Sequence, residues 1–166
     1  MRHLSLHRFQ LLCVALVIGL FAPMISASPT NAPFHATILF SEQVVPTGSL
    51  PCFLVGTISG TGVATTLGAV TLASTDCINP LPPTFTSYAF SSSHVVLTAV
   101  NGDQVWATYY GFLSPEGVIT GAYVIYGGTG RNANATGSGT LQGFETIDPA
   151  TGAGTGQIHL AGTLSH

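Results

Sequence analysis

The chain has 166 residues, of which 46% are hydrophobic and only 5% are charged, whereas roughly a quarter of the residues in an average soluble domain are charged. Low charge combined with high hydrophobicity excludes an intrinsically disordered protein. The chain contains three basic residues and no lysine. It therefore cannot neutralise a run of phosphates, and we expect no nucleic-acid partner.

The first 27 residues have the pattern of a secretory signal peptide. Arg2 and Arg8 precede an unbroken apolar run at 11–21, and the Ile-Ser-Ala sequence at 25–27 fits a small-residue cleavage site. The run is shorter than the roughly 20 apolar residues of a membrane-spanning helix, which disfavours a retained anchor. We expect cleavage after position 27, a secreted or extracytoplasmic protein without a membrane span, and a single domain over 28–166.

The expected mature chain is acidic and has two cysteines. Residues 28–166 contain one cation, Arg131, and six carboxylates, a formal net charge of −5. An even cysteine count in a secreted chain indicates a disulfide, here between Cys52 and Cys77. Closing their 25-residue separation would stabilise the fold by about 3 kcal/mol. Neither the cysteines nor the histidines have the spacing of metal ligands, so no metal is expected.

After position 27, short runs rich in Val, Thr, Ile, Tyr and Phe alternate with Gly, Pro, Asn and Asp, a pattern typical of strands and turns. The predicted strands are 34–42, 52–59, 62–66 leading into 69–74, 84–90, 94–100, 104–112, 118–126, 136–146 and 156–164. Consecutive hairpins of this kind predict an all-β, antiparallel protein. The architecture is then either a closed barrel or a two-sheet sandwich.

The connections between these strands have their own signals. The Asn101-Gly102 pair favours a two-residue type I′ hairpin. Proline and glycine predict tight turns at 114–117 and 148–152. The proline-rich segment 79–83 is predicted to be a loop, because proline cannot donate to a strand ladder.

Strands 104–112 and 118–126 are largely apolar on both faces. A sheet with one solvated face would instead alternate apolar with charged residues. The pattern indicates a filled interior together with an outer face covered by a partner, a lipid or another subunit.

The most specific segment is the glycine-rich turn Gly127, Gly128, Thr129 and Gly130. A phosphate-binding loop is excluded, because the chain has no lysine and a strand follows the segment. The glycines instead predict a tight corner of the chain.

This GGTG segment, with Ala135 and Gly137, resembles the signature shared by dirigent proteins and allene oxide cyclases. Segments 60–68 (GTGVATTLG) and 99–103 (AVNGD) are similar to GTGxATHLG and AANGD of small secreted bacterial proteins of that kind. The resemblance implies an eight-stranded antiparallel up-and-down barrel with an apolar cavity, often assembled as a trimer. It also implies either directed coupling of phenoxy radicals or ring closure of a fatty-acid epoxide.

The chain departs from the pattern of that superfamily at three positions. Asn132, Thr66 and Thr136 stand where the signature has an aromatic residue, a histidine and an arginine. No catalytic residue of those families is therefore transferred to this chain.

Five residues are candidate ligand contacts: Trp106, Tyr109, Tyr110, Tyr123 and Glu145. The aromatic side chains can line a pocket for an apolar molecule, with a core or interface role as the alternative. Glu145 lies late in a predicted strand. If it faced a cavity, burial would raise its pKa and it could act as an acid or a base.

Two kinds of function remain open. One is a non-catalytic barrel that binds a small apolar ligand or serves as a structural surface protein. The other is a cofactor-free cyclase or stereo-directing enzyme that positions an apolar reactive intermediate and excludes water. No cofactor is expected in either case. Polar groups converging on an apolar cavity would favour the enzyme, whereas a filled interior would favour the structural role.

Overall fold

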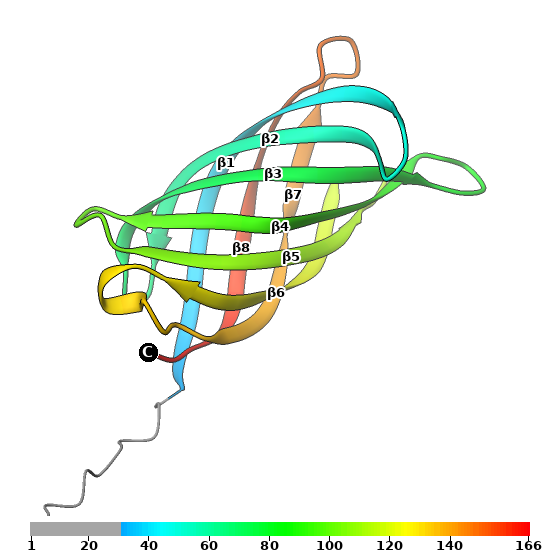
Figure 1. Ribbon diagram of the computed structural model, residues 1–166. Coiled ribbons are helices and arrows are strands. Elements are labelled where there is room, and N and C mark those ends of the chain that lie inside the picture. The colour runs from blue at the N-terminus through cyan, green and yellow to red at the C-terminus, as the bar shows by residue number, and fades with distance from the viewer. Residues whose placement is uncertain (1–30) are drawn as a thin grey trace, which may run out of the picture.

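The computed structural model describes residues 31–166, so the predicted signal peptide lies outside the described residues (Figure 1). These residues form a closed antiparallel barrel of eight strands in which each strand pairs with its neighbours in sequence and β1 pairs with β8. The predicted all-β up-and-down barrel is therefore confirmed. Within residues 31–166 no helix is long and apolar enough to cross a membrane.

The strands follow one another around the barrel in chain order. Their bounds are β1 (Ala32–Ser49), β2 (Cys52–Ala64), β3 (Gly68–Leu81), β4 (Ser87–Ala99), β5 (Gln104–Leu113), β6 (Val118–Gly128), β7 (Gly137–Ile147) and β8 (Ala153–Leu164), with a 3₁₀ turn η1 (Gly130–Asn132) between β6 and β7. The strands have between 10 and 18 residues, and most are longer than predicted. Barrel closure gives every strand two neighbours, so ladders extend through Gly, Ser and Pro positions that individually disfavour strands.

Several predicted boundaries are wrong. The predicted strands 84–90 and 94–100 are one continuous strand, β4, which begins at Ser87. Residues 62–64 continue β2, and the chain turns before β3 begins at Gly68. Residues 79–81, predicted to be a loop, belong to β3 and pair with β4. The pairing of β3 with β2 ends at Ile78, so Pro80 lies where β3 has a neighbour on one side only, a position that tolerates proline.

The predicted type I′ turn at Asn101-Gly102 is also wrong in its type. Gly102 is the only residue of this turn with a positive φ, +87°. Its N–H donates to the Ala99 carbonyl at 2.9 Å, and the Ala99 N–H donates to the Asp103 carbonyl at 2.9 Å. The connection is the longer hairpin loop in which a left-handed glycine follows a type I turn.

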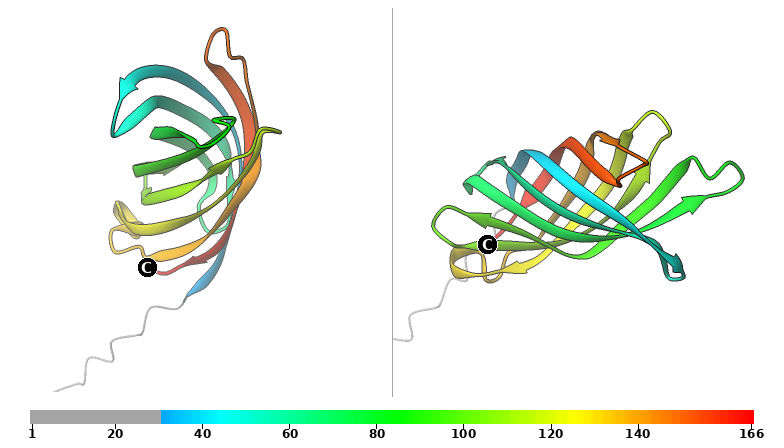
Figure 2. Two further views of the ribbon diagram at one scale, coloured as in Figure 1. Left: turned by 90° about the vertical axis from the view of Figure 1, so that its right-hand side faces the viewer. Right: turned by 90° about the horizontal axis from the view of Figure 1, so that it is seen from above.

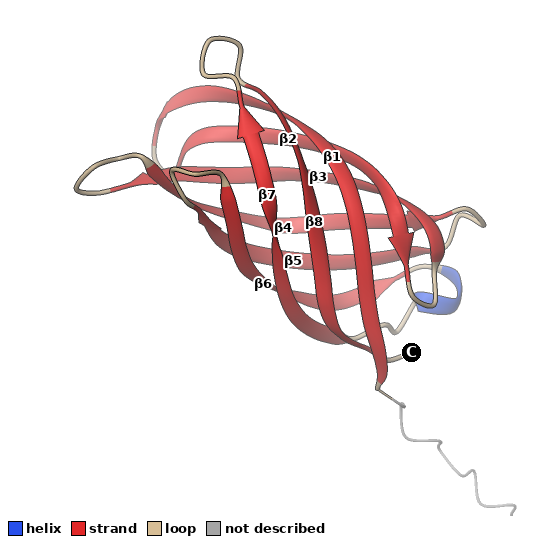
Figure 3. Ribbon diagram, turned by 180° about the vertical axis from the view of Figure 1, so that it is seen from behind, coloured by secondary structure: helices blue, strands red, loops and turns tan. Residues whose placement is uncertain are grey.

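The barrel is packed at one end and open at the other. The packed end carries η1 and the C-terminus, with the long hairpin loops at the opposite end (Figures 1 and 3). Phe34, Ala135 and Leu164 are completely buried there. Further buried apolar side chains belong to the same core, namely Ile38, Val70, Val95, Leu97, Val105, Tyr123, Ile125 and Leu160. Leu72 and Leu141 also belong to it but face the open half.

The predicted disulfide is confirmed. Cys52 and Cys77 are bonded, with their Cα atoms 4.9 Å apart. The bond joins the start of β2 to the late part of β3 at the open end of the barrel, where two views show the strand ends splaying outward (Figure 2). It therefore ties together two strands next to the cavity mouth.

Candidate functional site

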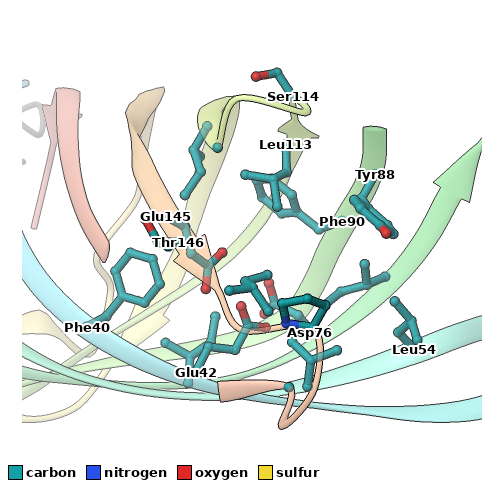
Figure 4. Close-up of a pocket in the computed structure, with 18 of the residues that line it drawn as sticks. Phe40, Glu42, Leu54, Asp76, Tyr88, Phe90, Leu113, Ser114, Glu145 and Thr146 are labelled. Atoms are coloured by element: carbon teal, nitrogen blue, oxygen red, sulfur yellow. The ribbon is translucent and has the colours of Figure 1, made fainter. Parts of the chain in front are cut away.

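The open half of the barrel contains a cavity of about 750 Å³ (Figure 4). Its size lies within the range typical of small-molecule sites. Most of its wall is apolar and comes from strands all around the barrel, including Phe40, Leu54, Ile58, Ile78, Phe90, Leu113, Ile119, Leu141, Ile147 and Ile158. Ser114–Gly117 and Pro149–Gly152, from the β5–β6 and β7–β8 loops, contribute to the same lining.

Three carboxyl side chains enter this apolar cavity from separate strands. Glu42 comes from β1, Asp76 from β3 and Glu145 from β7, and their exposed fractions are 7%, 4% and 8%. Each occupies an inward position of its strand, because side chains alternate between the two faces of a strand. Figure 4 shows the carboxyl groups gathered among apolar side chains.

Glycines on the neighbouring strands make room for these carboxyl groups. The cross-strand partners of Glu42, Asp76 and Glu145 are Gly154, Gly56 and Gly156, respectively. A methyl group added at Gly56 would collide with the Glu42 carboxyl, and one added at Gly154 would lie 2.5 Å from Glu145 Oε1. The missing side chains therefore create the niche that holds the acids.

Glu42 and Glu145 form a coupled carboxyl pair. Burial is the main cause that raises the pKa of Glu42 from 4.5 to about 9, and the hydrogen bond and negative charge of Glu145 raise it further. Burial also raises the pKa of Glu145, although its hydrogen bond to Glu42 opposes the shift. The pair therefore retains a proton on Glu42 at neutral pH, because two adjacent buried carboxylates repel each other.

Asp76 belongs to a separate hydrogen-bond network. Its Oδ1 accepts from the Tyr109 hydroxyl and from Ser74 Oγ, the latter at 3.1 Å. Ser74 Oγ also shares a hydrogen bond with Ser92 Oγ at 2.9 Å, in which Ser92 donates because the one Ser74 proton goes to Asp76. Ser92 lies beside an irregularity in the β4–β5 pairing. Burial raises the pKa of Asp76 from 3.8 to about 7, while the bonds from Tyr109 and Ser74 hold it lower than burial alone would.

The lining of the cavity contains acidic residues and no basic residue. Among the described residues that line it there are four acids, the three buried carboxyls and Glu116 at the mouth, and no Lys, Arg or His. Within residues 31–166 no cluster of three or more acids, histidines or cysteines is arranged to hold a metal ion. The chemistry available is hydrogen bonding and proton transfer by carboxyl groups.

The structure separates the five predicted contact residues. Tyr109 and Glu145 line the cavity. Tyr123 is buried in the packed half, with its ring edge-on to Phe34 at 6.2 Å. Trp106 and Tyr110 alternate with inward residues and lie on the outer face, where Tyr110 is 60% exposed.

The glycine-rich segment lies at the packed end of the barrel, with η1. Gly130 has a φ of +57°, and Thr129 Oγ1 accepts from the Gln104 N–H at 2.9 Å. Arg131 pairs with Asp103 at 3.2 Å on the surface. This segment is remote from the cavity lining and supports the barrel corner.

Sequence reasoning missed Glu42 and Asp76. Glu42 continues the inward series of Ile38 and Phe40, and Asp76 continues that of Leu72 and Ser74. An acid in register with buried apolar residues was the available signal. The predicted strand 69–74 stops before Asp76. Glu42 is the last residue of the predicted strand 34–42, where an acid is typical of a solvated strand end.

Comparisons with known proteins agree with this architecture. The chain has the fold of dirigent proteins. The structure of a pterocarpan synthase dirigent protein matches it with a TM-score of 0.51, covering 92% of this chain and 99% of that chain at 14% sequence identity. No protein-family model and no curated protein sequence matches the chain. The comparison therefore establishes the fold, whereas the function has to be inferred from the cavity.

The buried carboxyls predict a barrel that loses stability as the pH rises. Below pH 4.5 Glu42 is protonated in both states, whereas between 4.5 and about 9 only the unfolded chain releases its proton. Asp76 contributes a further loss of stability between pH 3.8 and about pH 7, because it too keeps its proton only in the folded protein. We expect the free energy of unfolding to be lower at pH 9 than at pH 5 by several kcal/mol, on the order of 5 or more.

Urea denaturation at a series of pH values measures this dependence. Glu42→Gln should flatten the curve, whereas the exposed control Glu116→Gln should leave it unchanged between pH 5 and 9. Stability that rises over this interval in the unmodified protein would contradict the assignment of buried, protonated acids.

Proposed function

We propose that the protein binds a small, largely apolar molecule in the open half of the barrel. The observation that carries this proposal is the convergence of three carboxyl groups from β1, β3 and β7 on an apolar cavity. Ligand sites typically combine a mostly apolar wall with a few placed polar groups that fix orientation. A barrel serving only as a structural element would have no need for a cavity or for acids buried within it.

The apolar wall supplies affinity and the acids supply selectivity. Burying apolar ligand surface contributes about 25 cal/mol per Å² before the costs of association. A ligand that leaves a buried carboxyl without a partner is disfavoured, because that group has already lost its water. The carboxyls should therefore select molecules with donors at matching positions.

Filling the cavity should abolish this binding. Ile158 lines the cavity from β8, and we expect Ile158→Trp to weaken binding of the neutral fluorophore 1-pyrenemethanol by about tenfold or more, since the indole occupies the ligand's space. Val63→Trp, on the exposed outer face of β2, is the matched control and should bind normally. Fluorescence anisotropy measures both affinities.

Thermal unfolding of both variants establishes that they are folded. If folded Ile158→Trp and Val63→Trp bind the probe equally well, the binding occurs outside the cavity and the proposal fails.

General acid–base catalysis without a cofactor is the second candidate function. Asp76, with a pKa of about 7, lies in the same cavity as Glu42, with a pKa of about 9. Titratable groups whose environments separate their pKa values are suited to opposite roles, a base and an acid. Within residues 31–166 both hydrogen bonds to Asp76 end on Oδ1, which leaves Oδ2 for proton transfer. The matching structure is named a synthase, which supports this candidate.

The ring opening of 5-nitrobenzisoxazole tests this chemistry, because it begins when a base removes a ring proton from a neutral, apolar molecule. We expect a rate that rises with pH through a midpoint near 7, set by Asp76. Asp76→Asn should lower the rate by about tenfold or more, and Glu116→Gln should leave it unchanged. Equal rates in the unmodified protein and in Asp76→Asn would eliminate Asp76 as the base.

The compartment and assembly form part of the proposal. The Cys52–Cys77 bond supports an oxidising, extracytoplasmic location. Exposed apolar side chains on the outer face of β5–β7 support a homo-oligomer, namely Tyr110, Phe112, Val118, Val124, Tyr126 and Phe144. The assembly we propose is the trimer implied by the sequence resemblance.

A further inference from the structure

We infer that the cavity selects lipophilic amines, which bind as ammonium cations with their charge against the Glu42 and Glu145 carboxyls. This inference rests on the proposed cavity function and names the ligand class. It is carried by three features of the site: the sign of its charges, its unpartnered oxygens and the shape of its niche.

The acidic lining disfavours the opposite class of ligand. The described residues that line the cavity include Asp and Glu but no Lys, Arg or His. Arg131 belongs to η1, at the packed end of the barrel. A fatty acid or another lipophilic anion would place its charge among carboxyls with no cation to pair with it. Such an arrangement is unfavourable at short range in a site of low polarity.

The two carboxyl groups share one proton and receive no hydrogen bond at Oε1 from residues 31–166. Apart from a proton shared between the two carboxyls, Glu42 Oε1 and Glu145 Oε1 have no partner among residues 31–166, although both side chains are more than nine-tenths buried. Buried polar atoms in native proteins are nearly always hydrogen-bonded. The two oxygens therefore require donors that the described chain does not provide.

A primary ammonium group fits this requirement. It carries three N–H donors on one compact cation, as a lysine ammonium does. It can therefore contact both glutamates while its apolar body lies against the wall. A neutral alcohol has one donor and no charge, so it satisfies fewer oxygens and gains no Coulomb energy.

Folding has already removed the carboxyl groups from water. A bound ammonium therefore adds its own desolvation but none for the acids, which shifts the balance that usually makes buried ion pairs unfavourable. Binding converts the protonated Glu42 carboxyl to a carboxylate: its O–H proton leaves to solvent and the ammonium takes its place. No covalent bond to the ligand forms or breaks.

The affinity for an amine should consequently rise with pH. The other titratable groups that line the cavity are Asp76 from β3, Tyr88 from β4, Tyr109 from β5 and, at the mouth, Glu116, and all are acidic or phenolic. Glu42, whose pKa is about 9, must lose its proton for the ion pair to form. We therefore expect tighter binding at pH 8.5 than at pH 6 for an amine that stays charged over this range.

A matched series of pyrene probes tests the inference. The probes are 1-pyrenemethylamine, 1-pyrenemethanol and 1-pyrenecarboxylate, which share one fluorescent body and differ in charge. At pH 8.5 the amine should bind about tenfold tighter than the alcohol, and the carboxylate should bind more weakly than either. Affinities come from fluorescence anisotropy on the folded barrel.

The double variant Glu42→Gln with Glu145→Gln is the decisive comparison. It should remove most of the advantage of the amine and leave the affinity of the alcohol within about threefold, because the apolar wall is intact. The single variant Asp103→Asn, which removes a charge at the packed end outside the cavity lining, should retain the preference for the amine.

The outcomes separate this inference from the function on which it rests. Binding of none of the three probes would overturn both. An alcohol that binds as tightly as the amine, a carboxylate that binds best, or an amine preference that survives the double variant would overturn the inference and leave cavity binding standing.

Discussion

The removal of three carboxyl groups from water is the constraint on which the rest of the site depends. Glu42, Asp76 and Glu145 are each less than a tenth exposed, and such burial disfavours the charged form. The closed barrel enforces that burial, since each carboxyl enters from a strand with neighbours on both sides. The outcome is a set of acids that hold protons at pH values where surface acids have released them.

The same closure divides the barrel into two halves with different tasks. The packed half, around Phe34 and Leu164, provides the contiguous apolar core that a domain of this size requires. The open half contains a cavity in place of a filled core, and the disulfide joins β2 to β3 beside the cavity. A rigid scaffold of this kind can hold costly buried groups in place, and such groups are commonly found at functional sites.

The sequence predicted the architecture well because its signals are local. Strand composition and turn residues were sufficient for an all-β antiparallel protein, and two cysteines were sufficient for the bridge. The eight-stranded barrel was implied by the resemblance that the GGTG segment carries. The end of β3 was predicted wrongly because Pro80 was assigned to a loop. Whether a strand tolerates a proline depends on which of its sides has a partner strand, and not on the proline alone.

The site was only half predictable. Glu145 and Tyr109 were identified, but the niche is created by pairing Glu42 with Gly154 and Asp76 with Gly56. These partners are 112 and 20 positions apart in the chain. Register around a closed barrel brings them together, and a single sequence does not display that register.

The titration of the individual carboxyl groups tests the central claim most directly. In protein with ¹³C-labelled Asp and Glu, the carboxyl chemical shifts report protonation group by group, with variants providing the assignments. The account predicts midpoints near 9 for Glu42 and near 7 for Asp76, and a midpoint below the ordinary value for Glu116, whose pKa is lowered by its hydrogen bond from Ser114. Midpoints for Glu42 and Asp76 in the range of exposed acids, near 4, would contradict it.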